Sequence, residues 1–264
     1  MGVFDFSGKM AVVTGGARGI GKEIALQFAG CGADVWIGDV IEEEAKKTLS
    51  ELEALGVKCG FTYTDVADED QVTRLLDDAI GASASGQIDF LVHNAGILVT
   101  GSVFDATSEE VERITAVNIT GMFNAMTIGI KKMMNNNGGG RVVLVSSVAG
   151  RHGFRVQGHY NATKAAGLNF AQSCAVEAAK YGINVNSICP GIIRTQMWDR
   201  ILEDAEKNLG VTQDQEWNKY IEEIPQKRAQ TPEDIANCVM FLCSYLSSAI
   251  TGQAINIDGG RYLN

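Results

Sequence analysis

The chain has 264 residues, of which 45% are hydrophobic and 20% are charged, an ordinary composition for a globular protein. The formal net charge of −10 argues against nucleic acid or an anionic membrane as a partner. No stretch approaches about 18 apolar residues and the first residues lack a signal-peptide pattern, so neither a membrane span nor secretion is predicted. The six cysteines form no C-x-x-C pair and show no metal-like spacing, which predicts reduced thiols, a cytoplasmic protein and no metal site.

Short apolar runs alternate with helical patterns along the chain. The predicted strands are Met10–Thr14, Asp34–Gly38, Val57–Thr62, Ile88–His93, Arg141–Ser146, Ile183–Ile188 and Ala254–Ile257. The predicted helices are Ile20–Ala29, Ile41–Leu55, Glu69–Ile80, Glu109–Met134, Tyr160–Lys180 and Pro232–Ser244. This alternation indicates a parallel seven-stranded sheet with helices on both faces. No linker divides the chain, so we predict a single α/β domain over residues 1–264, with residues 196–223 inserted as a helical flap.

A glycine-rich turn, Thr14-Gly15-Gly16-Ala17-Arg18-Gly19-Ile20-Gly21, follows the first predicted strand and opens a helix. Glycines permit a tight turn and a close approach of backbone to a pyrophosphate, and the helix N-terminus offers free N–H groups. The spacing G-x-x-x-G-x-G is a variant of the general dinucleotide fingerprint. A dinucleotide site is therefore predicted here, with a purely structural turn as the alternative.

Asp39 lies at the end of the second strand, eighteen residues after Gly21. A carboxylate there can accept hydrogen bonds from ribose hydroxyls and repels a 2′-phosphate, which predicts NAD rather than NADP. Arg18 favours the opposite choice, because a guanidinium beside the turn could pair with that phosphate. We give Asp39 the greater weight, although it could instead serve as a helix N-cap.

Tyr160 and Lys164 are four residues apart, so on a helix their side chains project from one face. An ammonium group beside a phenol favours the phenolate, and is expected to lower the tyrosine pKa from about 10. Such a tyrosine can exchange a proton with an alcohol or carbonyl oxygen. Ser147 lies thirteen residues earlier, at the end of the fifth predicted strand.

Together these features resemble the short-chain dehydrogenase/reductase family over the whole chain. The matching positions are Thr14–Gly21, Asp65-Val66, Asn94-Ala95-Gly96, Asn118, Ser147, Tyr160 with Lys164, and Pro190-Gly191 followed by Ile193 and Thr195. The resemblance implies a Rossmann-type doubly wound fold, a homotetramer and a catalytic set of Asn118, Ser147, Tyr160 and Lys164. One departure is His93, which occupies a position where many relatives carry a further asparagine, and which we interpret as a tolerated change.

The resemblance also assigns roles to the matching residues. Asp65 and Val66 are implied to hold the adenine ring, Asn94 to steady the strand beside the cofactor, and Thr195 to bind the nicotinamide carboxamide. Ser147 is implied to position the substrate oxygen, with Ser146 as the alternative. Lys164 is implied to hold the nicotinamide ribose. Asn118 is expected to bind a water molecule that links Lys164 to solvent.

The substrate is less well defined by the sequence. Met197 and Trp198 are expected to roof the substrate pocket, although Trp198 could equally be plain packing. The flap segment and the closing Asp258-Gly259-Gly260 resemble acetoin/2,3-butanediol and sugar-alcohol dehydrogenases. Eight acidic residues between Asp199 and Glu223 argue against an anionic acyl-carrier partner, unless they form only a solvated helix face.

The sequence therefore predicts an NAD-dependent oxidoreductase acting on a secondary alcohol or ketone, with a small diol or polyol as the substrate. A hydroxysteroid or bile-acid dehydrogenase and a 3-oxoacyl thioester reductase remain alternatives. A non-catalytic dinucleotide sensor is the alternative outside enzymes, but a sensor needs no activated tyrosine.

Overall fold

The computed structural model describes residues 4–136, 138–194, 198, 199, 202, 203, 206 and 210–263. Its strands are β1 (Met10–Thr14), β2 (Asp34–Asp39), β3 (Cys59–Tyr63), β4 (Phe90–His93), β5 (Gly140–Val145), β6 (Ile183–Pro190) and β7 (Ala254–Ile257). Its helices are α1 (Gly19–Gly30), α2 (Glu42–Glu53), α3 (Glu69–Ala82), α4 (Ser108–Thr115), α5 (Gly121–Met133), α6 (Gly158–Ala178), α8 (Gln213–Glu222) and α9 (Pro232–Cys243). Shorter turns are η1 (Ala116–Thr120), η2 (Val148–Gly150), η3 (Ala179–Tyr181) and η4 (Tyr245–Ser247).

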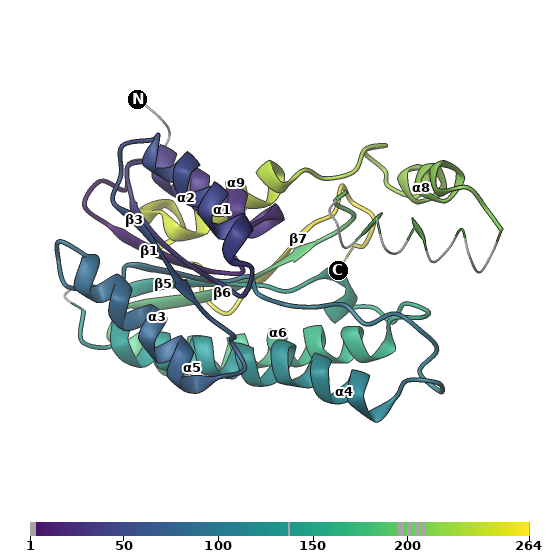
Figure 1. The fold of residues 1–264 in the computed structure, drawn as a ribbon, viewed down its shortest axis with the longest axis horizontal. Coiled ribbons are helices and arrows are strands. Elements are labelled where there is room, and N and C mark those ends of the chain that lie inside the picture. Colours follow the sequence, from purple (N-terminus) through teal and green to yellow (C-terminus); the bar gives the residue numbers. More distant parts are fainter. Residues whose placement is uncertain are drawn as a thin grey trace.

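The strands form one sheet in the order β3-β2-β1-β4-β5-β6-β7, and every neighbouring pair is parallel. Helices α1, α2 and α9 cover one face, and α3, α5 and α6 cover the other, so the molecule has three layers (Figure 1). Helix α8 lies beyond one end of the sheet (Figure 1). Within the described ranges, no helix combines the length and the apolar character needed to cross a membrane.

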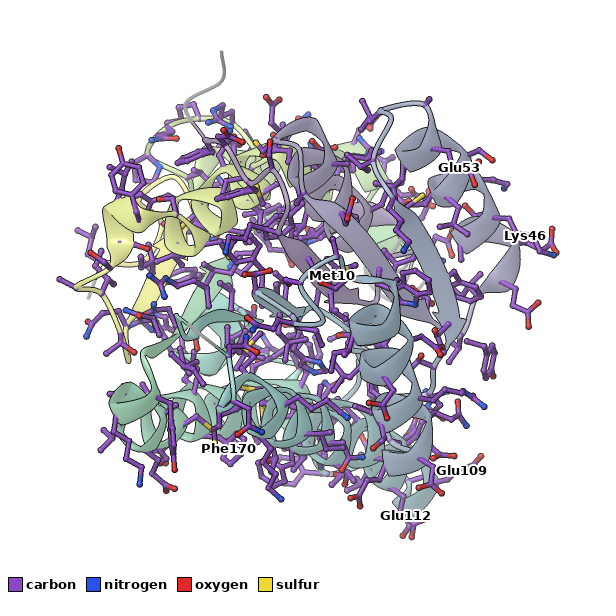
Figure 2. The ribbon with its side chains drawn as sticks, turned by 90° about the vertical axis from the view of Figure 1, so that its left-hand side faces the viewer. Met10, Lys46, Glu53, Glu109, Glu112 and Phe170 are labelled. Carbon is purple, nitrogen blue, oxygen red and sulfur yellow. The ribbon has the colours of Figure 1, made fainter. Side chains whose placement is uncertain are left out.

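Two hydrophobic cores, one on each face of the sheet, hold the layers together. The side chains of β1 alternate between these two cores. Ala11 and Val13 belong to the core that includes α1 and α9, whereas Met10 and Val12 belong to the core that includes α3, α5 and α6. Successive side chains of a strand point to opposite faces, so a strand covered on both sides must be apolar throughout. Figure 2 shows Met10 inside the molecule, while Lys46 and Glu53 point outward from α2.

The predicted seven-stranded parallel sheet is confirmed, and the predicted bounds agree with the structure to about two residues in all but one of the regular elements. The exception is the predicted helix Glu109–Met134. It is divided into α4 and α5 by a π-helical turn, in which the Gly121 N–H donates to the Ala116 carbonyl. Asn118 lies in this turn and hydrogen-bonds the backbone of Ile97 in both directions, which accounts for the local change of helical pitch.

The flap prediction is confirmed only in part. Helix α8 is present, and it begins with a capping box between Thr212 and Gln215. Residues 195–197, 200, 201, 204, 205 and 207–209 of this region lie outside the described residues.

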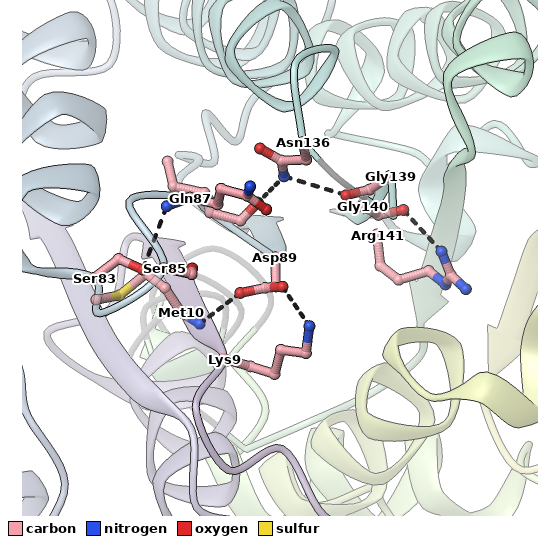
Figure 3. A network of polar contacts seen from close by, with 11 residues as sticks. Lys9, Met10, Ser83, Ser85, Gln87, Asp89, Asn136, Gly139, Gly140 and Arg141 are labelled. Atoms are coloured by element: carbon pink, nitrogen blue, oxygen red, sulfur yellow. Dashed lines mark hydrogen bonds and ion pairs between the residues drawn. The ribbon is translucent and has the colours of Figure 1, made fainter.

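A polar network ties the amino ends of β1, β4 and β5 together, at the edge of the sheet opposite their carboxyl ends (Figure 3). The Asp89 carboxylate accepts hydrogen bonds from the Met10 N–H at 2.9 Å and from Lys9 Nζ at 2.8 Å. The backbone carbonyl of Asp89 accepts a hydrogen bond from the Arg141 N–H. Asn136 donates to the carbonyls of Ile88 and Gly139, which closes the loop before β5.

This network generates a stability prediction. Asp89→Ala leaves the buried Met10 N–H without an acceptor, and we expect it to lower the free energy of unfolding by about 2 kcal/mol. Asp89→Asn keeps an acceptor and loses only a partly exposed ion pair, so the expected loss is below about 1 kcal/mol. Urea unfolding measures both values. Equal losses in the two variants would show that the ion pair, rather than the Met10 hydrogen bond, carries the effect.

Candidate active site

A groove of about 1360 Å³ runs along the carboxyl ends of the central strands. It crosses the point where the strand order reverses, because β1 lies between β2 and β4. Ligands of open parallel sheets bind in such a crevice. The predicted site residues that line it are Gly15, Arg18, Gly19, Ile20, Asp39, Asp65, Val66, Asn94, Ala95, Gly96, Ser147, Tyr160, Lys164, Pro190, Gly191, Ile193 and Trp198. Thr195 and Met197 lie outside the described residues.

Several glycines of the turn have no room for a side chain. A Cβ on Gly15 would lie 2.9 Å from the Ala95 backbone, and one on Gly21, which packs beneath the turn, would lie 2.0 Å from the Gly15 carbonyl oxygen. Gly15 and Gly19 also have positive φ angles of 65° and 57°, which L side chains rarely adopt. Helix α1 starts without a side-chain cap and without an acidic residue in its first turn. Its first N–H groups therefore fit an anionic group such as a pyrophosphate.

Asp39 fastens the turn to the end of β2. Its two carboxylate oxygens accept hydrogen bonds from the N–H groups of Ala17 at 3.0 Å and Ile41 at 3.1 Å. The residue that caps α2 is Ile41, so the N-cap alternative for Asp39 is wrong. The exposed Arg18 lines the same groove, so both residues that bear on the choice between NAD and NADP lie beside it.

The loops after β3 and β4 form the next part of the wall. Asp65 accepts a hydrogen bond from the Ala67 N–H, and Val66 is buried against Gly121, where a Cβ would lie 2.4 Å away. Asn94 donates from Nδ2 to the Gly15 carbonyl at 2.9 Å, which joins the end of β4 to the glycine turn.

The loop after β6 forms the opposite wall. The Gly191 N–H donates to the Ile257 carbonyl, and Ile193 forms a bridge with Gln230. A Cβ on Gly191 would lie within 2.8 Å of Asp258 and of the Gln230 side chain. The backbone after Pro190 is therefore closely packed.

Three of the predicted catalytic residues converge between β5 and α6. Tyr160 and Lys164 lie one turn apart on α6, with Lys164 Nζ 5.6 Å from the centre of the Tyr160 ring. Ser147 follows β5 and forms a hydrogen bond with the Tyr160 side chain. Ser146 instead donates to the Lys164 carbonyl at 3.0 Å, so the structure favours Ser147 over Ser146 as the serine beside Tyr160.

Burial controls the protonation of this pair. It raises the pKa of Tyr160 to about 12, although the hydrogen bond from Ser147 acts in the opposite direction. It also lowers the pKa of Lys164 to about 8. The expected lowering of the Tyr160 pKa is therefore not found in this structure, because the loss of hydration on burial is the largest influence on the tyrosine.

The side chain of Asn118 makes its hydrogen bonds within the protein, whereas the resemblance implies that this residue binds a water molecule. Its Oδ1 accepts from the Ile97 N–H at 2.8 Å, and its Nδ2 donates to the Ile97 carbonyl at 2.9 Å and to Thr163 Oγ1 at 3.1 Å. The side chain is thus engaged by protein groups. A water molecule bound at this residue would depend on its backbone carbonyl or on its neighbours.

His93 is buried with 2% of its surface exposed, and its Nδ1 lies 2.9 Å from Thr14 Oγ1. Burial, reinforced by the charge of Lys164, lowers the pKa of His93 to about 3. The imidazole is therefore neutral at physiological pH.

Trp198 lines the groove and packs edge-on against Trp217 and Tyr220, with ring centres 6.0 and 5.1 Å apart. Arg261 also lines the groove, and no sequence motif indicates this position. Its guanidinium pairs with Glu223 and lies over the Tyr220 ring at 5.4 Å. Because Arg261 follows a Gly-Gly pair at the end of the chain, only the fold brings it to the groove.

Glu216, which also lines the groove, is 6% exposed and therefore not part of a solvated helix face.

Comparisons with known proteins agree with this arrangement. A family profile described as enoyl-(acyl carrier protein) reductase matches residues 15–261. A short-chain dehydrogenase/reductase of Armillaria gallica is 37% identical over 96% of this chain and 95% of that protein. L-2,3-butanediol dehydrogenase of Corynebacterium glutamicum is 34% identical over 97% of this chain and 99% of that protein. A crystal structure of an actinorhodin polyketide ketoreductase with NADPH has a TM-score of 0.91 at 30% identity, covering 96% of this chain and 97% of that chain.

These likenesses span nearly the whole chain and include the glycine turn, the groove and the tyrosine–lysine helix. The fold is the one that binds nicotinamide dinucleotides in these oxidoreductases. The chain belongs to the short-chain dehydrogenase/reductase family.

Proposed function

We propose that this protein is an NAD-dependent dehydrogenase/reductase that interconverts a secondary alcohol and its ketone, with a small diol or polyol as the substrate. The observation that carries the proposal is the convergence of Ser147, Tyr160 and Lys164 on the groove that also contains the glycine turn. A sensor of dinucleotides would need the turn but would have no use for a buried tyrosine–lysine pair.

The cofactor would supply the hydride donor or acceptor at its nicotinamide ring. The glycine turn and the start of α1 would hold the pyrophosphate, and Asp39 the adenosine ribose. Asp65 and Val66 would hold the adenine, Lys164 and Tyr160 the second ribose, and residues 190–195 the nicotinamide. Asn94, Ala95 and Gly96 would support the cofactor from the end of β4.

Tyr160 is the proposed acid and base. Because its pKa is raised to about 12, it carries its proton at neutral pH and is suited to donate that proton to a ketone oxygen. Ser147 would orient the same oxygen by a hydrogen bond. Lys164 would add positive charge, which stabilises the phenolate left after the proton transfer.

The choice of a polar substrate rests on the flap side of the groove. Glu216, Lys219, Tyr220, Glu223 and Arg261 all line it, so this wall offers many groups that can hydrogen-bond hydroxyls. The likeness to L-2,3-butanediol dehydrogenase supports the same substrate class. NAD is favoured by Asp39, and the proposed location and assembly are a cytoplasmic homotetramer.

A second candidate is a reductase or dehydrogenase of a larger apolar ketone, such as a hydroxysteroid or a 3-oxoacyl thioester. It is favoured by the apolar side chains of Leu98, Val148, Phe154, Val156 and Trp198, which also line the groove. A panel of diols, polyols, hydroxysteroids and 3-oxoacyl thioesters, followed by NADH absorbance, separates the candidates. No turnover with any member of the panel would count against an enzyme of this class.

Tyr160→Phe is expected to lower kcat at least 100-fold in both directions, on the order of a general acid–base contribution, because the hydroxyl carries the proton. NAD affinity, measured by calorimetry, should fall by no more than about tenfold, the loss of one hydrogen bond to the ribose, since Lys164 remains. Tyr181→Phe, at a tyrosine with 38% exposure, is the matched control and should behave like the wild type. A Tyr160→Phe variant that retains a tenth of wild-type kcat would remove the acid–base assignment.

Asp39→Ala is expected to weaken the preference for NAD over NADP by about 1 to 3 kcal/mol, measured as the ratio of kcat/KM values. The change removes a charged acceptor for ribose hydroxyls and relieves repulsion of a 2′-phosphate. Arg18→Ala should shift the preference in the opposite direction. A wild-type enzyme that already prefers NADP would contradict the assignment and make Arg18 the deciding residue.

Lys164→Met is expected to stabilise the free protein at pH 7 while abolishing turnover. Folding lowers the Lys164 pKa from 10.5 to about 8, so the unfolded chain binds more protons between those values. Stability therefore rises with pH through this window, and the charged lysine costs about 3 kcal/mol below it. Chemical denaturation should show the advantage of the methionine variant at pH 7 and its decline towards pH 10. A difference independent of pH would contradict a buried lysine whose pKa is lowered by folding.

A further inference from the structure

A second, small cavity adjoins the groove beside Lys164. It measures about 10 Å³, which is near the room that one water molecule needs. Its lining comes from the ends of β4 and β5, the π-helical turn, α5 and α6, and consists of His93, Ala95, Asn118, Met122, Leu144, Ser146, Thr163, Lys164 and Gly167. A cavity of this size holds water only when several polar groups face it.

The hydrogen bonds around Thr14 determine which nitrogen of His93 carries the proton. Thr14 Oγ1 accepts from the N–H groups of Asn94 at 3.2 Å and Ala95 at 3.3 Å. A hydroxyl has two acceptor sites and one proton. Both acceptor sites are used, so the Thr14 proton is donated to His93 Nδ1, 2.9 Å away. The neutral ring therefore carries its own proton on Nε2.

This Nε2–H group has no hydrogen-bond acceptor among the residues that the structure describes. His93 as a whole residue is only 2% exposed, so its ring has little access to bulk water as an acceptor. The cavity that His93 lines provides the space for an acceptor. Lys164 lines the same cavity, and its charge acts on His93.

We propose that the cavity binds one water molecule that accepts hydrogen bonds from His93 Nε2–H and from the Lys164 ammonium group, and that Thr14 and His93 are positioning residues for Lys164. The catalytic consequence rests on the proposed function, whereas the water site does not. The new element is the role of His93, which lines the cavity and whose ring proton stays on Nε2 because the Thr14 hydroxyl donates to Nδ1.

The buried ammonium group needs such a partner. Lys164 Nζ donates to the Val145 carbonyl at 3.1 Å, and this is its only hydrogen bond to a described residue. The titratable groups that face it are Tyr160 on its own helix, Cys189 on β6 and His93 on β4, and none of them is a carboxylate. A water molecule held by His93 would supply a second acceptor and favour the charged form of the lysine.

Substitutions of His93 test the geometry as well as the chemistry. In His93→Gln the side-chain amide reaches the position of Nε2, so the donor to the water is kept. In His93→Asn the amide reaches only the position of Nδ1, and in His93→Leu no donor remains. We expect the glutamine variant to resemble the wild type and the other two to lose the water.

The first readout does not depend on turnover. Nitrogen NMR of the free wild-type protein should place the His93 proton on Nε2. NMR titration should give a Lys164 pKa about one unit lower in His93→Leu and His93→Asn than in the wild type and His93→Gln, which corresponds to the loss of one hydrogen bond to a charged group. A proton on Nδ1, or an unchanged Lys164 pKa in all three variants, would overturn the proposal.

The second readout is the pH profile of alcohol oxidation. A less charged Lys164 leaves Tyr160 harder to deprotonate, so the rising limb of kcat should move about one unit to higher pH in His93→Leu and His93→Asn. Preserved turnover at pH 7 with a lowered melting temperature, or a better rescue by Asn than by Gln, would show a packing role for His93 and refute the positioning role. If no alcohol is turned over but the Lys164 pKa shifts as expected, the proposed function fails and the water site stands.

Discussion

The contact between the carboxyl ends of β1 and β4 determines the geometry of the whole site. The side chain of Asn94 bonds the Gly15 carbonyl at 2.9 Å, and the Gly15 Cα lies so close to Ala95 that a Cβ would not fit. This contact sets the height of the glycine turn above the sheet and the path of the chain through Gly96. A Cβ on Gly96 would in turn lie 3.4 Å from Lys164 Nζ, so the position of the lysine depends on the same close approach.

Burial is the second constraint, and it acts against the charges that catalysis requires. Tyr160 and Lys164 both lie inside the protein, where desolvation raises the pKa of one and lowers the pKa of the other. Both shifts favour the neutral forms. Among the described residues, the groups that favour the charged forms are the Ser147 hydroxyl for the tyrosine, and the Val145 carbonyl and Cys189 for the lysine. A small change in hydrogen bonding near this pair therefore has a large effect on its protonation.

The sequence was sufficient to predict the sheet, because apolar runs such as Met10–Thr14 must be strands covered on both faces. It also placed the glycine turn and the Tyr160–Lys164 helix, since both depend on local spacing. It did not predict the π-helical turn at Asn118, which arises from bonds to the distant backbone of Ile97. It gave the wrong direction for the pKa of Tyr160, because spacing reports which charges are near and says nothing about how much water is removed.

The flap side of the groove shows why substrate choice is harder to predict than cofactor choice. The residues proposed to hold the cofactor follow consecutive strands, so their order along the chain determines their positions. Arg261, Glu223 and Tyr220 instead meet through a contact between the C-terminal tail and α8. Glu216 has the sequence context of an exposed helix residue, yet it is buried and interacts with Tyr220. The wall proposed to face the substrate is thus built by tertiary contacts between segments that carry no motif of their own.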